Sequence, residues 1–257
     1  MTDEELFWRP RRLLLALLED ADSTLVCAQT VTMARAFETE VSGILVEETA
    51  IFELAALTVC AEVGAVTRRF QQLDPEGLAA RADRRAALLR REIEALEASL
   101  GQAVPLRVLR GRTVDPLREA GPDDLIFYTG GPGRLDNRDE VAALLEAARE
   151  SAGLLLQPPR VPWREGPVVA LHHAPEAAER LLPVLQRLAN GADIEQHLAV
   201  DTAEALVAGS LLAEQRRARL LVVELAEAEA GERMQRALRQ CMRRLNCPLL
   251  LINPRPR

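Results

Sequence analysis

The chain has 257 residues, of which 48% are hydrophobic and 28% charged, and its formal net charge at pH 7 is −7. This apolar content is enough to bury a core and excludes a disordered chain, whereas the negative charge argues against binding to nucleic acid or anionic membranes. Four scattered cysteines without a CxxC pair are typical of reduced thiols in a cytosolic protein, not of a disulfide scaffold or a metal site. We therefore expect a cytoplasmic protein with no metal, no nucleic-acid partner and no membrane partner.

The first half of the chain alternates short apolar runs with helix-compatible stretches. An apolar run at 13–18 is typical of a strand buried on both faces, and a helix over 23–40 leads to a second such strand at 41–46. These three segments form a βαβ unit. The next stretch, 50–70, is compatible with helix and would cover one end of the sheet, and a long helix over 75–100 follows.

Three more strands are predicted in the first half, at 104–109, 124–129 and 154–156. Between the last two lie a glycine-rich turn at 130–134 and a helix at 139–151. Residues 158–166 contain three prolines and make the best linker in the chain. We therefore predict a first domain over residues 1–160 and a linker over 161–166.

The second half repeats this pattern with about one strand–helix pair fewer. Its strands are predicted at 168–171, 194–200, 220–223 and 249–252, and its helices at 175–189, 201–215 and 232–245. We assign residues 167–257 to a second, shortened domain. Alternation on this scale predicts parallel sheets with helices on both faces and right-handed crossovers.

The order of these segments, repeated twice, resembles the universal stress protein family. Residues 107–111 resemble the family's strand followed by glycine, Asp124-Leu125-Ile126 resembles its fourth strand, and Cys247-Pro248 with the apolar run after it is similar to its closing strand. The resemblance covers almost the whole chain. It implies an α/β fold of two tandem, doubly wound parallel-sheet domains of the universal stress protein (adenine nucleotide α-hydrolase-like) type, the second shortened.

A glycine-rich loop follows the fourth strand, where the resemblance implies a nucleotide site. Glycines allow a phosphate to approach the backbone, and a helix N-terminus favours anions. The candidate residues for holding ATP or another adenine nucleotide are Gly130, Gly131, Gly133 and Arg134.

The chain departs from the family's nucleotide-binding pattern at two further places. Nine residues after the loop, Ala143-Leu144 stands where the family has Gly and Ser or Thr. At the end of the first strand, Leu18 or Glu19 stands where the family has an Asp that holds the ribose. No cofactor is therefore assured.

His172 and His173 end the first strand of the second half, where α/β sheets place their ligand crevice. Two imidazoles there could bind a metal or an anion, but neighbouring residues of a strand point to opposite faces, so both cannot easily hold one ion. Their role stays open. In the same half, Glu224 begins a loop with three carboxylates that would repel a polyphosphate.

Strands 154–156 and 249–252 are leucine-rich, and the resemblance implies that the fifth strand is a sheet edge used for pairing. Because unpaired apolar edges invite strand addition, we expect these two strands to pair and to join the halves about a pseudo-twofold axis. A further homodimer is expected from helix faces rich in Leu and Ala. The sequence contains no nucleophile elbow, HExxH or P-loop motif, so we predict no enzyme activity.

Two functions remain open at this stage. The first is a non-catalytic stress-response or regulatory protein that binds a protein partner or a small ligand in the first domain's crevice. The alternative is an ATP- or AMP-binding switch with at most slow hydrolysis, which would use the loop from Gly130 to Arg134.

Overall fold

The structure is a computed structural model, and it describes most of the chain. The described residues are 8–18, 23–49, 53–54, 57, 61–63, 70–72, 74–129, 137–158, 161, 164–225 and 231–253. Its strands are β1 (Arg12–Leu17), β2 (Glu40–Glu48), β3 (Ala61–Val63), β4 (Phe70–Gln72), β5 (Leu106–Gly111), β6 (Asp124–Tyr128), β7 (Gly153–Leu156), β8 (Val168–His172), β9 (Ile194–Leu198), β10 (Leu220–Glu224) and β11 (Leu249–Ile252). Its helices are α1 (Ser23–Phe37), α3 (Pro75–Leu100), the 3₁₀ helix η2 (Asp115–Glu119), α4 (Arg138–Glu150), α5 (Pro175–Ala189), α6 (Thr202–Arg216) and α7 (Glu232–Arg244).

Nine of these strands form a single sheet in the order β5-β2-β1-β6-β7-β11-β10-β8-β9. All neighbouring strands are parallel except β7 and β11, which are antiparallel. In the first half β1 is central, with β2 and β5 on one side and β6 and β7 on the other. In the second half β8 is central, with β9 on one side and β10 and β11 on the other, so β5 has no counterpart in the described chain. The predicted doubly wound α/β fold is confirmed.

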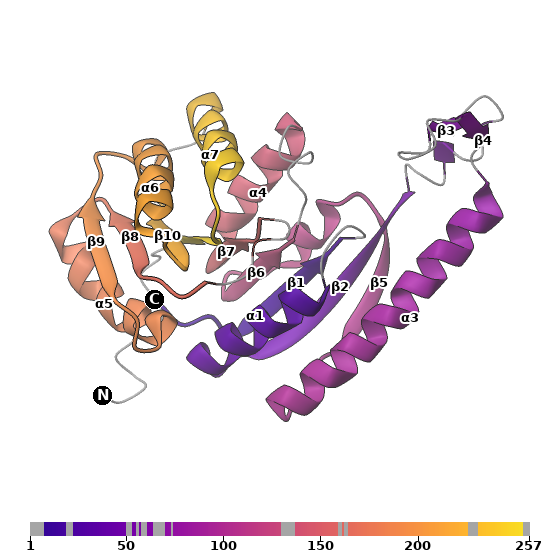
Figure 1. Ribbon diagram of the computed structural model, residues 1–257, viewed down its shortest axis with the longest axis horizontal. Coiled ribbons are helices and arrows are strands. Elements are labelled where there is room, and N and C mark those ends of the chain that lie inside the picture. Colours follow the sequence, from indigo (N-terminus) through magenta and orange to yellow (C-terminus); the bar gives the residue numbers. More distant parts are fainter. Residues whose placement is uncertain are drawn as a thin grey trace.

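Helices cover both faces of the sheet (Figure 1). On one face α1, α3 and α5 bury a cluster that includes Leu13, Leu89 and Leu185. On the other face α4, α6 and α7 bury a second cluster that includes Ile126, Leu144 and Leu238. The inner strands are buried on both sides because each face is covered, and strands of this kind read as continuous apolar runs in the sequence.

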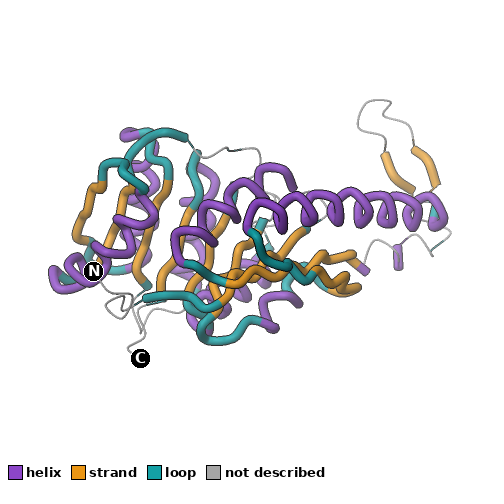
Figure 2. The backbone as a smooth tube through the Cα atoms, turned by 90° about the horizontal axis from the view of Figure 1, so that it is seen from below, coloured by secondary structure: helices purple, strands orange, loops and turns teal. Residues whose placement is uncertain are grey.

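The long helix α3 has the ends that its sequence predicts. The side chain of Asp74 accepts a hydrogen bond from the backbone N–H of Glu76 at 3.1 Å, and Gly101 ends the helix at a φ of 69°. Figure 2 shows that α3 extends well beyond the sheet and that β3 and β4 lie at its far end. Its many charged residues suit this exposed position. In the part of the chain that the structure describes, no helix is both long and apolar enough to cross a bilayer.

The prediction of helix over 50–70 holds at residues 53–54 and is wrong at residues 61–63 and at Phe70. Residues 61–63 form β3, which pairs antiparallel with β4, with Val63 opposite Phe70. In the sequence, Gly64 follows β3 directly, and a glycine is a poor continuation for a helix.

The predicted pairing of 154–156 with 249–252 is confirmed. Leu154, Leu155 and Leu156 of β7 lie opposite Leu251, Leu250 and Leu249 of β11, and all six are at most 1% exposed. The division into domains 1–160 and 167–257 stays a prediction, because one sheet runs through both halves.

Further contacts hold the β7–β11 junction from outside the sheet. The indole N–H of Trp8 donates to the carbonyl of Ala152 at 2.7 Å, and the backbone N–H of Asn253 donates to the same carbonyl at 3.0 Å. Trp8 also packs edge-on against Phe37, with ring centroids 5.1 Å apart. The first residues of the described chain therefore tie α1 to the junction.

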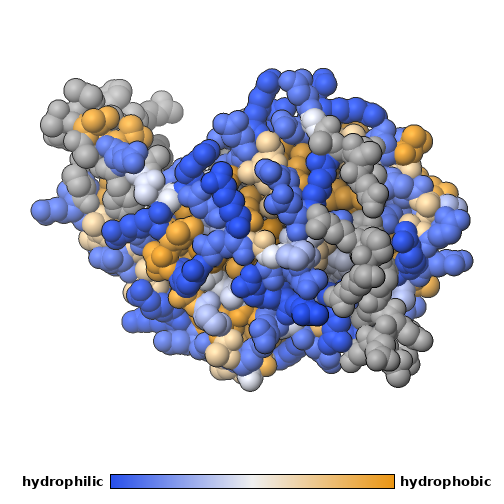
Figure 3. Space-filling view, turned by 180° about the vertical axis from the view of Figure 1, so that it is seen from behind, coloured by the Kyte–Doolittle hydropathy of each residue, from blue (hydrophilic) through white to orange (hydrophobic). Residues whose placement is uncertain are grey.

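The exposed apolar side chains are spread over the surface. Figure 3 shows a face that is mostly hydrophilic, with small apolar patches separated by charged side chains. The larger exposed ones are Leu54, Leu57, Leu88, Val108, Leu182, Leu198, Val200 and Leu211. Leu198 lies at the end of β9, and Val200 follows it two residues later.

Gly153 offers a direct test of the junction. A Cβ at this position would overlap the carbonyl oxygen of Leu251 on the partner strand, so only glycine lets β7 approach β11. We expect Gly153→Ala to lower the free energy of unfolding by about 1–3 kcal/mol, measured by urea denaturation.

Gly121→Ala is the matched control, because the nearest atom to a Cβ there is Asp124 Oδ2 at 3.5 Å, an ordinary contact. This control should change the free energy of unfolding by no more than about 0.5 kcal/mol. Equal effects of the two substitutions would show that close approach at the junction is not required.

Candidate functional site

The carboxyl ends of the first half's strands form the first candidate site. Doubly wound sheets bind ligands outside this edge. Glu47, at the end of β2, is 5% exposed and accepts a hydrogen bond from Arg110 Nε of β5 at 2.9 Å. At the end of β6, the hydroxyl of Tyr128 donates to Glu140 of α4, and both side chains are buried. The buried carboxylates of this edge are therefore engaged within the protein.

A cavity of about 150 Å³ opens at this edge. It is lined by Glu48, Thr49, Gly111, Arg112, Thr113, Val114, Asn137 and Glu140, which come from β2, the turn between β5 and η2, and the start of α4. The turn is held by Asp115, whose carboxylate accepts from the backbone N–H of Arg112 at 2.6 Å. The charged lining comprises two carboxylates and one guanidinium, so the cavity suits hydroxyl or amino groups better than a polyphosphate.

The helix α4 begins at Arg138, one residue before its predicted start at 139. Asn137 precedes the helix, and its side chain accepts a hydrogen bond from the backbone N–H of Asp139 at 3.0 Å. Ala143 and Leu144 lie in the second turn of α4, and Leu144 is fully buried in the core. These two residues therefore cannot contact a phosphate at the helix N-terminus. Asn137, which lines the cavity, was missed although its position before an acidic first turn is a helix-start signal.

The predicted nucleotide-binding residues are only partly testable here. Gly130, Gly131, Gly133 and Arg134 lie outside the described residues, as does Glu19. Leu18 is described and is 1% exposed within the core, so it offers no group to a ribose. The glycine loop stays a prediction.

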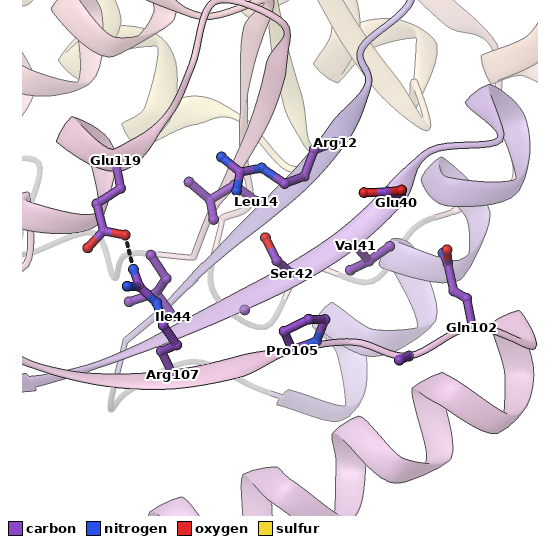
Figure 4. A pocket seen from close by; sticks show the side chains of 12 residues that line it. Arg12, Leu14, Glu40, Val41, Ser42, Ile44, Gln102, Pro105, Arg107 and Glu119 are labelled. Carbon is purple, nitrogen blue, oxygen red and sulfur yellow. Dashed lines mark hydrogen bonds and ion pairs between the residues drawn. The ribbon is translucent and has the colours of Figure 1, made fainter.

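A larger cavity, about 610 Å³, lies at the opposite edge of the sheet, beside the amino ends of β1, β2 and β5 (Figure 4). Two arginines line it, and each is paired within the protein. Arg12 donates to Asp124 through Nε at 3.0 Å and through a second bond from Nη2, and Arg107 pairs with Glu119. The hydrogen bonds and charge of Asp124 raise the pKa of Arg12. Because these guanidinium groups already bind carboxylates, the cavity has no evident preference for an anion.

A half-buried histidine lies at the carboxyl edge of the second half. Nε2 of His173 lies 2.8 Å from the backbone oxygen of Glu224 and 3.1 Å from the hydroxyl of Thr202. This side chain thus bridges β8, β10 and the first turn of α6, at the place where the strand order reverses. The acidic loop that Glu224 begins leads us to expect no nucleotide in the second half. The bridge made by His173 is a second reason for this prediction, which stays untested.

His172 lies on the other face of the sheet from His173, as the alternation along a strand predicts. It is 3% exposed, and burial lowers its pKa from the ordinary value of 6.5, while the charge of Glu224 acts in the opposite direction. Glu224 is itself 4% exposed and lies 3.7 Å from Nη2 of Arg180. Within the described residues no group of three His, Cys, Asp or Glu side chains is arranged to hold a metal ion.

The cysteines that the structure describes are free thiols. Burial raises the pKa of Cys27 to about 11 and that of Cys247 to about 12, and it raises the pKa of Cys241 as well. The arginines near Cys241 and Cys247 in the sequence do not activate these thiols, because desolvation of the thiolate dominates. Cys60 lies outside the described residues.

Comparison with known proteins finds similar structures but no similar sequences. No family model matches the chain, and no curated protein matches it. A universal stress protein from Archaeoglobus fulgidus DSM 4304 is similar in structure, with a TM-score of 0.60 and 11% identity, covering 96% of this chain and 98% of that one. A functionally unknown protein from Pseudomonas aeruginosa PAO1 is similar with a TM-score of 0.53 and 13% identity, covering 95% and 93%.

The chain therefore has the universal stress protein fold over almost its whole length. At 11% identity this likeness establishes the architecture, and the functional residues must be argued from the chain itself.

Because the imidazole of His172 is buried, we expect acid to lower the stability of the folded protein. The pKa of His172 is lowered in the folded state, so as the pH falls through 6.5 the unfolded chain takes up a proton that the folded chain does not. Stability present at neutral pH is therefore lost in acid. We expect the melting temperature to fall between about pH 7.5 and pH 5.5, and to fall less in His172→Asn.

His197→Asn is the control for removing an imidazole from the same region, since its side chain is 35% exposed. This variant should retain most of the wild-type pH dependence. If His172→Asn and the wild type lose stability equally over this range, His172 is not the group responsible.

Proposed function

We propose that this chain is a non-catalytic regulatory protein of the stress-response kind, and that it binds a small ligand or a partner's side chain at the carboxyl edge of its first half. The observation that carries this proposal is the cavity lined by Arg112, Thr113 and Asn137. It lies where doubly wound folds bind ligands and draws its lining from three separate elements. A cytoplasmic location and a protein partner belong to the same proposal.

The ionisable groups around this cavity support binding rather than catalysis. Glu47 is held by Arg110, and Glu140 accepts from the hydroxyl of Tyr128. A general acid or base needs a proton that it can exchange with the substrate. Carboxylates fixed by partners inside the protein instead serve to hold β2, β5, β6 and α4 in register around the cavity.

The cavity also limits the size of the ligand. Ligand pockets for drug-sized molecules span about 300–1,000 Å³, whereas this cavity measures about 150 Å³. A whole nucleotide would have to extend beyond the described lining. A small polyhydroxylated or amino-bearing group fits both the volume and the two carboxylates of the lining.

The second candidate is an ATP- or AMP-binding switch with at most slow hydrolysis. One observation favours it: the cavity adjoins the N-terminus of α4, where Asn137 leads from the glycine loop into the helix. In this function Gly130, Gly131, Gly133 and Arg134 would hold the phosphates, and Thr113 would lie beside the sugar or base.

Mass spectrometry of freshly purified, denatured protein identifies any small molecule that co-purifies. Thermal shifts with ATP, ADP and AMP then separate the two functions, because a nucleotide at a hundredfold excess over its Kd adds about 2.7 kcal/mol of stability. We expect no such shift, and a co-purified molecule, if found, that is small and carries no polyphosphate.

Arg112→Ala tests the cavity directly, since this exposed side chain lines it. It should weaken binding of the co-purified molecule by about tenfold, which corresponds to about 1.4 kcal/mol. Arg118→Ala, on the neighbouring η2, is the matched control and should leave binding unchanged. A full nucleotide shift that Arg134→Ala abolishes would overturn the leading proposal in favour of the switch.

A further inference from the structure

The strand β9 is a free edge of the sheet. In the first half the equivalent strand, β2, is covered on its outer side by β5, which pairs with it from Gly43 to Glu48. In the described part of the second half no strand takes that place, and β9 pairs with β8 alone. The shortening of the second half therefore leaves one edge without a neighbour.

The outward-facing backbone groups of β9 can be assigned from its bonds to β8. The N–H of Val168 donates to the carbonyl of Asp193 at 2.8 Å, and the N–H of Ala199 donates to the carbonyl of His172 at 2.9 Å. Backbone groups of every second residue in a strand point the same way, so residues 193, 195, 197 and 199 face β8. The N–H and C=O groups of residues 194, 196 and 198 therefore point to the free side.

The sequence of β9 is complementary to itself in the antiparallel direction. The strand reads Ile-Glu-Gln-His-Leu. A twofold axis at Gln196 places Ile194 of one copy opposite Leu198 of the other, and Glu195 opposite His197. The outward residues 194, 196 and 198 then form the hydrogen-bonded pairs, and Glu195 and His197 form non-hydrogen-bonded pairs, in which side chains approach most closely.

The pairing also brings polar side chains of β9 together. Within the chain, Nε2 of His197 lies 3.7 Å from Oε2 of Glu195. On the twofold axis the amide of Gln196 meets the same amide of a second copy. Glu195, whose Oε2 lies 3.2 Å from Nε of Arg216, meets the second copy's His197, so each acid is matched by a donor.

Apolar surface is exposed at the same place. Leu198 is 62% exposed and Val200 is 84% exposed, far more than the leucines of the other strands. On α5, Arg187 donates to the carbonyl of Ala36 of α1, and Leu182, 38% exposed, lies about 140° around the helix from Arg187. Leu182 therefore lies on the flank of α5 away from α1, toward β9.

The opposite edge of the sheet shows how this protein protects an edge strand. β5 carries Arg107 and Arg110, held by Glu119 and Glu47, and charged side chains discourage strand addition. β9 contains no Lys, Arg or Pro. The contrast between the two edges favours pairing at β9.

We infer that β9 is a dimerisation strand, through which two copies of the chain join their sheets edge to edge, antiparallel, with Gln196 of one copy opposite Gln196 of the other. This interface differs from the dimer through helix faces that composition suggested. It does not depend on ligand binding at the first half's cavity.

Disulfide cross-linking of the full chain tests the register. In a hydrogen-bonded antiparallel pair the two Cα atoms lie about 5.5 Å apart, within the range that a disulfide spans. Gln196→Cys should therefore form a covalent dimer under mild oxidation. Leu198→Cys is the matched control, because two copies of residue 198 would lie about 14 Å apart. The wild type shows the background from the native cysteines.

Sedimentation equilibrium tests the edge itself. We expect the wild type to be a dimer, Leu198→Lys to raise the dimer dissociation constant at least about tenfold, and Val108→Lys on the exposed part of β5 to leave it unchanged. Circular dichroism checks that each variant is folded. A monomeric wild type, a dimer indifferent to Leu198→Lys, or cross-linking at 198 as efficient as at 196 would overturn the inference.

Discussion

The antiparallel pairing of β7 with β11 is the interaction on which the rest of the structure depends. Every other strand pair in the sheet lies within one half of the chain, and this one joins the halves. Its side chains are buried, and its backbone hydrogen bonds are shielded from water by α4 and α7 on one face and by Trp8 on the other. Two half-sheets with exposed leucine-rich edges would be prone to pair with other chains. The junction removes both edges at once.

Joining the halves at their last strands has a consequence at the far ends of the sheet. The outermost strands become β5 and β9, which are not equivalent, because the described residues of the second half include no counterpart of β5. One edge carries arginines that are neutralised by acids, and the other carries a self-complementary, partly apolar strand. The carboxyl edges differ as well: the first half keeps a small cavity beside α4, and in the second half the half-buried His173 lies at this edge. The two halves thus share one arrangement of strands and differ at their carboxyl edges.

Much of the fold could be predicted from the sequence, since strands buried on both faces leave continuous apolar runs and helices carry caps such as Asp74 and Gly101. Within the stretch 50–70 the prediction of helix was wrong at residues 61–63 and at Phe70, because helix compatibility is a weak signal where glycine interrupts it. The site was harder to predict. Asn137 was missed because its place in the cavity lining depends on how the start of α4 meets β2 and the turn after β5. The pairs Glu47–Arg110 and Tyr128–Glu140 likewise depend on which elements are neighbours in the fold. The glycine loop itself stays a prediction.

Native-state hydrogen exchange, resolved by amide, is the most direct test of whether the junction makes the two halves one cooperative unit. Amides of β1, β6, β7, β11 and β10 should share one free energy of exchange, equal to that of global unfolding, since opening either half would break the β7–β11 ladder. A lower free energy for β8, β10 and β11 than for β1, β2 and β6 would show that the second half opens alone, and would contradict the central role of the junction.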